Sequence, residues 1–185
     1  MCKKYEEFHY PITSLPIAKG IVFSKKQCPQ SQAEMAEMEK IPYRNLIGCL
    51  AFLASRTRPD IAYATNIFSQ YQQEPGMAHW QGLLKLLGYV KYTQSLKLNI
   101  SNLKELKLIA YSDADYANNK NDRTSMGGQI IFLGKVPIEW RSFKQKAIAL
   151  STLEAEFVAL TEAAKELVWI SRILNVKNQS LSHRI

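Results

Sequence analysis

The sequence predicts an α+β fold, in which a helical module is followed by a β-β-β-α module. The first observation is that apolar residues recur at helical spacing in stretches between residues 43 and 92. The second is that the pattern changes near residue 96, where short apolar runs typical of strands begin. A long amphipathic stretch over Ser151–Leu174 then predicts a closing helix. The expected organisation is an irregular, extended segment over residues 1–42, a helical module over residues 43–95 and a sheet module over residues 96–185.

Prolines interrupt the N-terminal segment and disfavour any long periodic element there. They are Pro11, Pro16, Pro29 and Pro42. Beyond them, helices are predicted wherever large apolar residues gather on one face of the chain. These helices are Tyr43–Arg56, Asp60–Gln73 and Met77–Tyr92. Asp60 is expected to cap the second of them, and Pro75-Gly76 is expected to end it.

The sheet module is predicted from short apolar runs with turn residues between them. Leu96–Ile100 alternates apolar and polar residues, and Leu106–Tyr111 is apolar enough for a buried strand in the centre of the sheet. Gln129–Leu133 and Val136–Phe143 predict further strands, joined by a turn at Gly134-Lys135. Because the connections are short, we expect the neighbouring strands to be antiparallel.

The composition indicates a globular protein that favours polyanionic partners. The chain of 185 residues is 46% hydrophobic and carries a formal net charge of +8, so a real core and an attraction to nucleic acid are expected. Cys2, Cys28 and Cys49 share no spacing typical of a zinc site or a disulfide framework. The N-terminus lacks a secretory signal pattern, and no apolar run is long enough for a bilayer. We therefore expect an intracellular protein, cytoplasmic or nuclear, with no membrane partner.

The closing helix offers the first candidate functional residue. Its large apolar line is expected to face the core and consists of Leu153, Phe157, Leu160, Ala164, Leu167 and Ser171. Glu162 and Glu166 are then expected to point away, and Glu154 is expected to pair with Ser151 in a capping box. Glu156 lies only about 60° from the apolar line, so it needs a partner there. A border position that reaches solvent or pairs with a lysine is the alternative to a functional role.

Asp113 is the second candidate, because it follows the strand predicted at Leu106–Tyr111. A short carboxylate at a strand end also commonly starts a turn, so that structural role stays open. Two-metal phosphodiester hydrolysis uses a cluster of carboxylates to hold two ions about 4 Å apart, and Mg²⁺ prefers such oxygen ligands. A strand that supplies Asp113 and a helix that supplies Glu156 would begin such a cluster.

Ordered motifs extend these observations along the chain. In the second half they are Tyr111-Ser-Asp-Ala-Asp-Tyr-Ala117, Asp122-Arg-Thr-Ser-Met-Gly-Gly128, Trp140 with the basic tract Arg141–Lys146, and Ala149-Leu-Ser-Thr-Leu-Glu-Ala-Glu-Phe-Val-Ala-Leu160. Together they closely resemble the RNase H domain of copia-type retrotransposon Pol polyproteins. Upstream motifs look like the connecting region between the reverse transcriptase and that domain: Tyr43-Arg-Asn-Leu-Ile-Gly48, Thr57-Arg-Pro-Asp-Ile-Ala62 and His79-Trp80.

The resemblance implies an RNase H-like fold and metal-dependent hydrolysis of the RNA strand of RNA–DNA hybrids. It matches Asp113 to the family's first metal-binding aspartate and Glu156 to its helix glutamate, which together would hold Mg²⁺ or Mn²⁺. Asp115 is a second-choice ligand, while Ser112 and Arg123 are expected to be structural or to face phosphate. The implied partners are RNA–DNA hybrid or other nucleic acid and the rest of the retrotransposon Pol, within retrotransposon particles where these assemble.

The family's site needs at least one further aspartate after the long helix, and Phe157–Ile185 contains none. A truncated copy is therefore expected, in which cleavage is weak or lost, and the absence of a polymerase palm motif argues against DNA synthesis. One alternative is a non-catalytic module that binds nucleic acid or another part of Pol through exposed aromatic residues such as Trp169. A basic α+β domain with no retained activity is the other.

Overall fold

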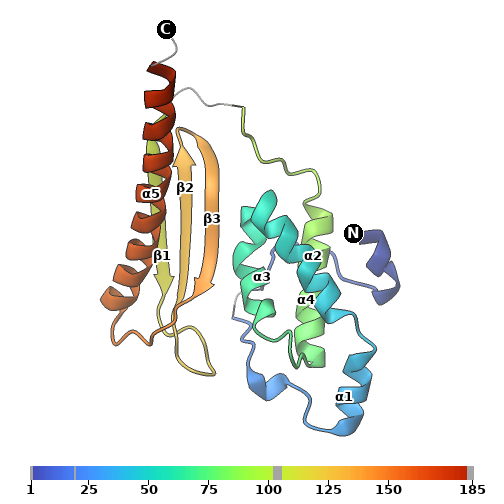
Figure 1. Cartoon of the computed structure of the whole chain (residues 1–185). Coiled ribbons are helices and arrows are strands. Elements are labelled where there is room, and N and C mark those ends of the chain that lie inside the picture. The colour runs from blue at the N-terminus through green and yellow to red at the C-terminus, as the bar shows by residue number, and fades with distance from the viewer. Residues whose placement is uncertain (1, 19, 102–105, 183–185) are drawn as a thin grey trace. The chain divides into compact units, whose positions relative to one another are not determined.

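The computed structural model describes residues 2–18, 20–101 and 106–182, and the chain divides into two compact units. The helical unit comprises Met1–Leu98 together with Asn119–Arg123, and the sheet unit comprises Asn99–Asn118 together with Thr124–Ile185. Figure 1 shows the helices of the first unit and the sheet with one long helix in the second. This mixed content fits the α+β class predicted from the sequence.

The helical unit contains the 3-10 helices η1 (Cys2–Phe8), η2 (Lys25–Gln27) and η3 (Pro59–Ile61) and the α-helices α1 (Gln32–Glu39), α2 (Tyr43–Arg56), α3 (Ala62–Ser69) and α4 (Met77–Tyr92). Helices α2 and α4 have the predicted bounds. Helix α2 buries one apolar face, whereas α4 is buried on most of its sides. The predicted helix Asp60–Gln73 is wrong in extent, since η3 and α3 replace it and the last helical residue is Ser69.

The core of the helical unit lies where α2, α3 and α4 pack against one another. Leu46 and Leu50 of α2 and Leu83 and Leu87 of α4 are fully buried, and Phe68 of α3 fills the space beside them. Burial of side chains of this size stabilises a fold by roughly 1.5–3 kcal/mol each. The apolar residues that recur at helical spacing in the sequence are therefore the ones that pack between these helices.

The N-terminal segment, for which the sequence predicts irregular structure, contains η1, η2 and α1 and packs along α4. Tyr5 of η1 is buried in the core of the helical unit. A Cβ added at Gly88 would lie 1.8 Å from the carbonyl oxygen of Pro11, and one added at Gly76 would lie 1.7 Å from that of Gln27. Glycine at these two positions lets the segment approach the helix backbone.

The sheet unit contains β1 (Leu108–Asp115), β2 (Met126–Leu133), β3 (Val136–Lys144) and α5 (Thr152–Ser182). The strands are antiparallel, as predicted, in the order β1-β2-β3. Strand β1 was expected in the centre but lies at an edge of the described sheet, because β2 takes the middle position. Gly134 adopts φ +60° in the turn between β2 and β3, a conformation that glycine reaches without steric cost.

The strand predicted at Leu96–Ile100 is wrong. These residues have no regular secondary structure, and no strand of the described sheet pairs with them. Leu96 and Ile100 are both exposed. An alternating pattern forms a strand only where a neighbouring strand supplies hydrogen-bond partners, and none of the described strands pairs with these residues.

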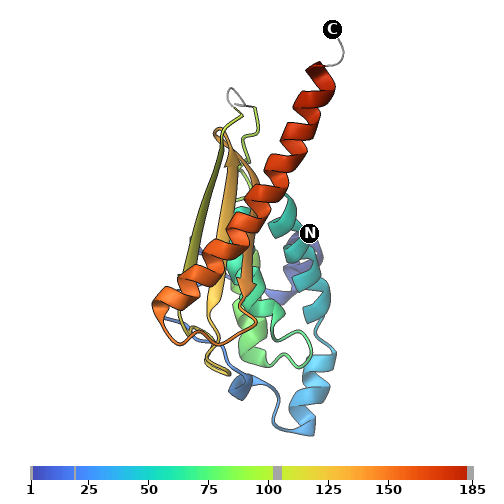
Figure 2. The same cartoon turned by 60° about the vertical axis from the view of Figure 1, so that its left-hand side comes forward.

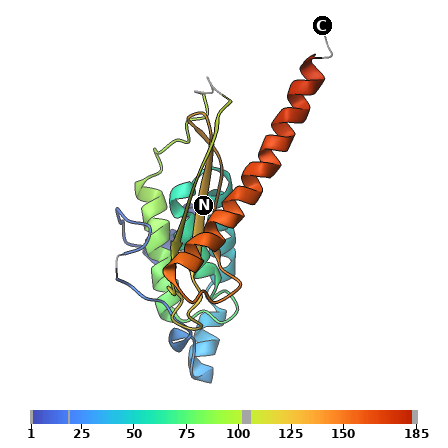
Figure 3. The same cartoon turned by 90° about the vertical axis from the view of Figure 1, so that its left-hand side faces the viewer.

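Helix α5 begins as the sequence predicts and continues further. The Ser151 hydroxyl accepts a hydrogen bond from the backbone N–H of Glu154, while the Glu154 carboxylate accepts one from the backbone N–H of Leu150. This reciprocal cap satisfies donors that the first turn would leave open. The helix extends to Ser182 instead of Leu174. Figures 2 and 3 show that it crosses one face of the sheet obliquely and runs on beyond it.

Candidate functional site

Asp113 and Glu156, the predicted metal ligands, lie at the same end of the sheet unit. Asp113 is near the C-terminal end of β1, and Glu156 is near the start of α5, which begins at that end (Figure 1). Asp113 is exposed and Glu156 is partly buried. The residue opposite Asp113 on β2 is Gly128, where an added Cβ would meet no atom within 4 Å. The surface beside the Asp113 carboxylate is therefore open.

Strand alternation places Asp113 on the face of the sheet that α5 does not cover. Helix α5 covers the face that carries Arg141, because Arg141 Nη2 lies 3.1 Å from Glu162 Oε2. Gln129 is the cross-strand partner of Arg141, and Ser112 is the cross-strand partner of Gln129, so these residues share one face. Asp113 comes one residue after Ser112 and points the opposite way. The predicted ligands thus reach one end of the sheet from its two faces.

The carboxylates available at this end do not make a complete metal site. Across residues 2–18, 20–101 and 106–182, no group of three or more His, Cys, Asp or Glu side chains is placed to hold a metal ion. A Mg²⁺ ion takes about six oxygen ligands, of which protein carboxylates usually supply one or two and water or substrate the rest. The structure brings Asp113 and Glu156 to one end of the sheet but to its two faces, so their assignment as ligands stays a prediction.

Asp115, the second-choice ligand, forms the turn that follows β1. The Asn118 side-chain amide donates a hydrogen bond to Asp115 Oδ2. The next residues are held by a bond of 3.0 Å from the Ala117 backbone N–H to the hydroxyl of Ser125, which is fully buried. Ala117 has φ +49°, an uncommon conformation for a residue with a side chain. The turn-forming role that the sequence left open for Asp113 thus falls to Asp115.

Ser112 and Arg123, which the sequence predicts to be structural or to face phosphate, lie in ordered parts of the sheet and of the turn after β1. Ser112 lies on the face of the sheet that α5 covers and is partly buried. Arg123 has φ +59°, and its backbone N–H donates to the carbonyl oxygen of Asn119 at 2.8 Å. Their predicted contact with phosphate is a proposal for experiment.

The face of α5 expected to meet the core is wrong. Ala155, Ala159 and Ala163 are at most 2% exposed, whereas Leu153 and Phe157 are 67% and 61% exposed. The helix contacts β1 and β2 closely, and alanine permits the nearest approach of a helix to a sheet. The large apolar line therefore lies on the outer side of the helix. Trp169 is exposed, as expected.

In this orientation of α5, Glu162 and Glu166 lie on the side of the helix near the sheet, although the sequence predicts that they point away from it. Glu162 accepts hydrogen bonds from Arg141 and from Lys165, and the pKa of Glu162 is lowered, first by the Lys165 bond. Glu139 of β3 accepts two hydrogen bonds from the Gln129 amide, at 3.1 and 3.2 Å. Burial raises the pKa of Glu139, and the negative charge of Glu166 raises it further. The sequence analysis missed this cluster of charged and polar side chains because it assigned the wrong face of α5 to the sheet.

The helical unit holds a second polar network around Asp60. Arg58 donates to both carboxylate oxygens of Asp60 through Nε and Nη2, at 2.9 and 2.8 Å, and Tyr89 donates to Asp60 Oδ2 at 2.9 Å. Burial alone would raise the pKa of Asp60, but these hydrogen bonds outweigh burial and lower it. The predicted helix cap is therefore wrong: Asp60 neutralises Arg58, which is 9% exposed.

In the part of the chain that the structure describes, no helix combines the length and the apolar character needed to cross a bilayer.

Comparisons with known proteins connect the chain with retrotransposons. It is 37% identical over 161 residues to the Retrovirus-related Pol polyprotein from transposon TNT 1-94 of Nicotiana tabacum, which covers 87% of this chain and 12% of that protein. It is 37% identical over 172 residues to the Retrovirus-related Pol polyprotein from transposon RE2 of Arabidopsis thaliana, covering 93% of this chain and 12% of that protein. No family model and no solved structure matches the chain.

A shorter relative is matched along nearly its whole length. The Secreted RxLR effector protein 161 of Plasmopara viticola is 39% identical over 134 residues, which is 72% of this chain and 94% of that protein. The chain thus spans only a small part of the large Pol polyproteins but almost all of this one. The similarity covers both the helical unit and the sheet unit, and the chain belongs to the family of copia-type retrotransposon Pol polyproteins.

Proposed function

We propose that the chain is the connection and RNase H-like portion of a copia-type Pol polyprotein and that it binds RNA–DNA hybrid. The observation that supports this most is the position of Asp113 and Glu156 at one end of an antiparallel sheet, with an open surface beside Asp113. The formal net charge of +8 favours binding to the phosphates of a hybrid. Lys146, which follows β3, is exposed and available for such a contact.

Hydrolysis of the RNA strand is the family activity that these carboxylates would serve. A bound Mg²⁺ or Mn²⁺ pair would activate water and stabilise the leaving oxygen. Asp113 and Glu156 would hold such ions only in part, because the described residues bring no third carboxylate to them. We therefore propose that the chain retains binding, while cleavage by the chain alone is weak or absent.

The test is binding and cleavage of a labelled RNA–DNA hybrid by the whole chain. We expect an affinity that falls steeply with salt, because released counterions drive phosphate binding. We also expect Mg²⁺ to strengthen binding in the unsubstituted chain and to have no such effect on Asp113→Asn. Glu7→Gln is a matched control, since Glu7 is exposed and the substitution changes the charge equally. If Mg²⁺ still strengthens binding in Asp113→Asn, Asp113 is not a metal ligand. Strong cleavage of the hybrid would reject the proposal that the chain alone is weakly active or inactive.

The exposed apolar line of α5 favours a second candidate function, a non-catalytic module that binds another part of Pol. Its largest members, Leu153, Phe157 and Leu160, are all more than half exposed. Contiguous apolar surface of this kind commonly marks an interaction site. This function predicts that Phe157→Ser abolishes binding to the purified reverse transcriptase portion of the same Pol and leaves hybrid binding unchanged. Loss of hybrid binding alone would support the first function instead.

A further inference from the structure

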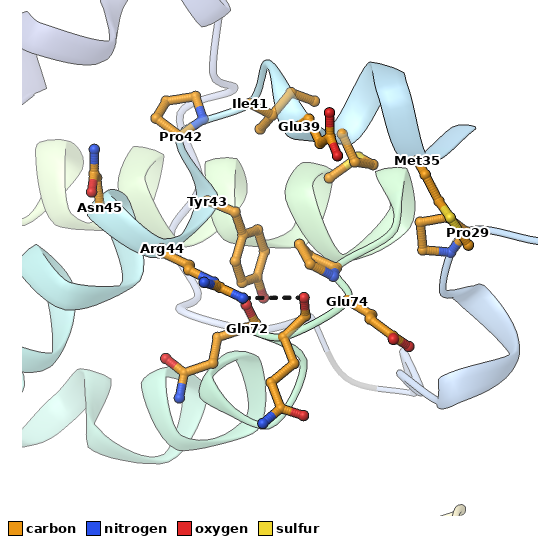
Figure 4. A pocket seen from close by; sticks show the side chains of 13 residues that line it. Pro29, Met35, Glu39, Ile41, Pro42, Tyr43, Arg44, Asn45, Gln72 and Glu74 are labelled. Carbon is orange, nitrogen blue, oxygen red and sulfur yellow. Dashed lines mark hydrogen bonds between the residues drawn. The ribbon is translucent and has the colours of Figure 1, made fainter. Parts of the chain in front are cut away.

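A pocket in the helical unit is lined by none of the predicted metal ligands, which belong to the sheet unit. Its volume is about 550 Å³, and it lies between α1, the start of α2 and the loop that follows α3 (Figure 4). The lining residues are Pro29, Met35, Met38, Glu39, Ile41, Pro42, Tyr43, Arg44, Asn45, Gln72, Gln73, Glu74 and Pro75. This is the size range of cavities that bind small ligands or a few side chains of a peptide.

One end of the pocket is apolar and adaptable. Met38 and Tyr43 are buried and belong to the core of the helical unit, so they form a fixed base. Met35 and Pro29 stand at the same end in Figure 4, and Met35 is half exposed. Methionine side chains are flexible and polarisable, and therefore fit alkyl chains of varied shape. This end suits the methylene stem of a long side chain.

Two carboxylates stand beside this apolar end. Glu39 projects from α1 and Glu74 from the loop after α3, and Figure 4 shows them on different sides of the pocket. Both side chains are exposed, and neither has a hydrogen bond or an ion pair with any residue that the structure describes. They offer a local site for a positive charge.

Arg44 also lines the pocket, beside the loop that carries Glu74. Its Nε donates to the backbone carbonyl of Gln72 at 2.8 Å, and its Nη2 donates to that of Gln73 at 3.4 Å. A guanidinium group has five N–H donors, so others remain for a ligand. Because Arg44 is cationic, the positive charge of a ligand belongs at the Glu39 and Glu74 end, and carbonyl oxygens belong near Arg44.

We propose that this pocket binds a peptide segment that carries lysine or arginine. The alkyl stem lies along Met35 and Met38, the charged end lies between Glu39 and Glu74, and the peptide carbonyls face Arg44. Nucleic acid fits less well, because its phosphates would be repelled by the carboxylates. A wholly apolar peptide would cover the methionines and leave both carboxylates without a counter-charge.

The experiment is fluorescence anisotropy of the full chain with a labelled hexapeptide of alternating leucine and arginine. The same peptide with citrulline in place of arginine removes the charge and keeps the shape. We expect the arginine peptide to bind and the double variant E39Q/E74Q to weaken that binding on the order of tenfold, because charge-assisted hydrogen bonds are lost. Met35→Lys should weaken it as well, by placing an ammonium group at the charged end.

The matched control is E6Q/E7Q, which changes the charge equally at exposed positions that do not line the pocket. This control should bind like the unsubstituted chain, and circular dichroism should show unchanged folding of every variant. Equal binding of the citrulline peptide, equal weakening by the control, or no weakening by E39Q/E74Q would each overturn the proposal. RNA binding that E39Q/E74Q strengthens, together with no binding of the arginine peptide, would assign the pocket to nucleic acid and also overturn the proposal.

Discussion

Arg141 on β3 and Glu162 on α5 form an ion pair, with 3.1 Å between Nη2 and Oε2. The pair identifies the face of α5 that meets the sheet. That face carries Ala155, Ala159 and Ala163, and the large apolar side chains lie on the outer face. An exposed ion pair of this kind contributes at most about 1 kcal/mol, so other contacts stabilise this packing, among them the buried alanines and the hydrogen bond of 2.8 Å from the Gln145 amide to the Ala155 carbonyl oxygen.

The alanine face predicts a position-specific effect of added volume. Ala159→Leu should reduce the free energy of unfolding by about 1–3 kcal/mol, because the extra methyl groups meet a sheet with no room for them. Ala164→Leu makes the same chemical change on the exposed side and should stay within about 0.5 kcal/mol. Urea unfolding followed by circular dichroism measures both. Equal effects of the two substitutions would show that a different face of α5 meets the sheet.

The sequence was sufficient for α2 and α4 and insufficient for the phase of α5, and one physical difference explains both outcomes. In α2 and α4 the largest apolar residues, such as Leu46 and Leu87, are also the buried ones. In α5 the small residues are buried and the large ones are exposed, so hydrophobic size selects the wrong face. Close approach to a sheet depends on the absence of a side chain, which a periodicity of large residues does not record.

The candidate site was predictable in part for a related reason. The resemblance selected Asp113 and Glu156, and the fold brings both to one end of the sheet unit. The Glu139 and Gln129 pair depends on the strand register, which is irregular between Ile131 and Phe132. A shift of register changes which residues share a face, and short-range patterns do not show it.

Gly88 provides a test of the packing between the N-terminal segment and α4. Gly88→Ala should destabilise the chain by about 1–3 kcal/mol, since the new Cβ would lie 1.8 Å from the Pro11 carbonyl oxygen. Gly48→Ala is the matched control in α2, where a Cβ meets nothing within 4 Å and the better helix propensity should stabilise by about 0.5–1 kcal/mol. Thermal unfolding, with limited proteolysis of the N-terminal segment, reports both effects. Destabilisation by Gly48→Ala to the same degree would contradict this explanation.

Asp60 predicts a loss of stability at low pH. Its pKa is lowered in the folded chain by the bonds from Arg58 and Tyr89, so its contribution is present above the ordinary aspartate pKa of about 3.9. That contribution disappears as the pH falls through the lower pKa of the folded chain. Asp60→Asn leaves Arg58 without its counter-charge and should cost about 1–3 kcal/mol at pH 7.

Melting temperatures between pH 2 and pH 7 test this account of Asp60. The difference between the unsubstituted chain and Asp60→Asn should be largest at neutral pH and should narrow at the acidic end. Glu7→Gln, at an exposed position, should leave the melting temperature unchanged at both ends of this pH range. A difference that stays constant over the whole range would mean that Asp60 acts through shape and not through its charge.

Glu139 predicts the opposite dependence on pH. Its pKa is raised in the folded chain by burial and by Glu166, so between the ordinary glutamate pKa of about 4.3 and this raised value the folded chain binds more protons than the unfolded chain. The free energy of unfolding therefore falls as the pH rises through that window. Glu139→Gln keeps an oxygen that accepts from Gln129 and removes the charge, so it should raise the melting temperature at pH 7 and have little effect at pH 4. Glu162→Gln removes the negative charge and one of the two oxygens that accept from Arg141 and Lys165, so it should lower the melting temperature at pH 7. A lower melting temperature for Glu139→Gln at pH 7 would show that the Glu139 charge is stabilised by Arg141 more than it is penalised by burial.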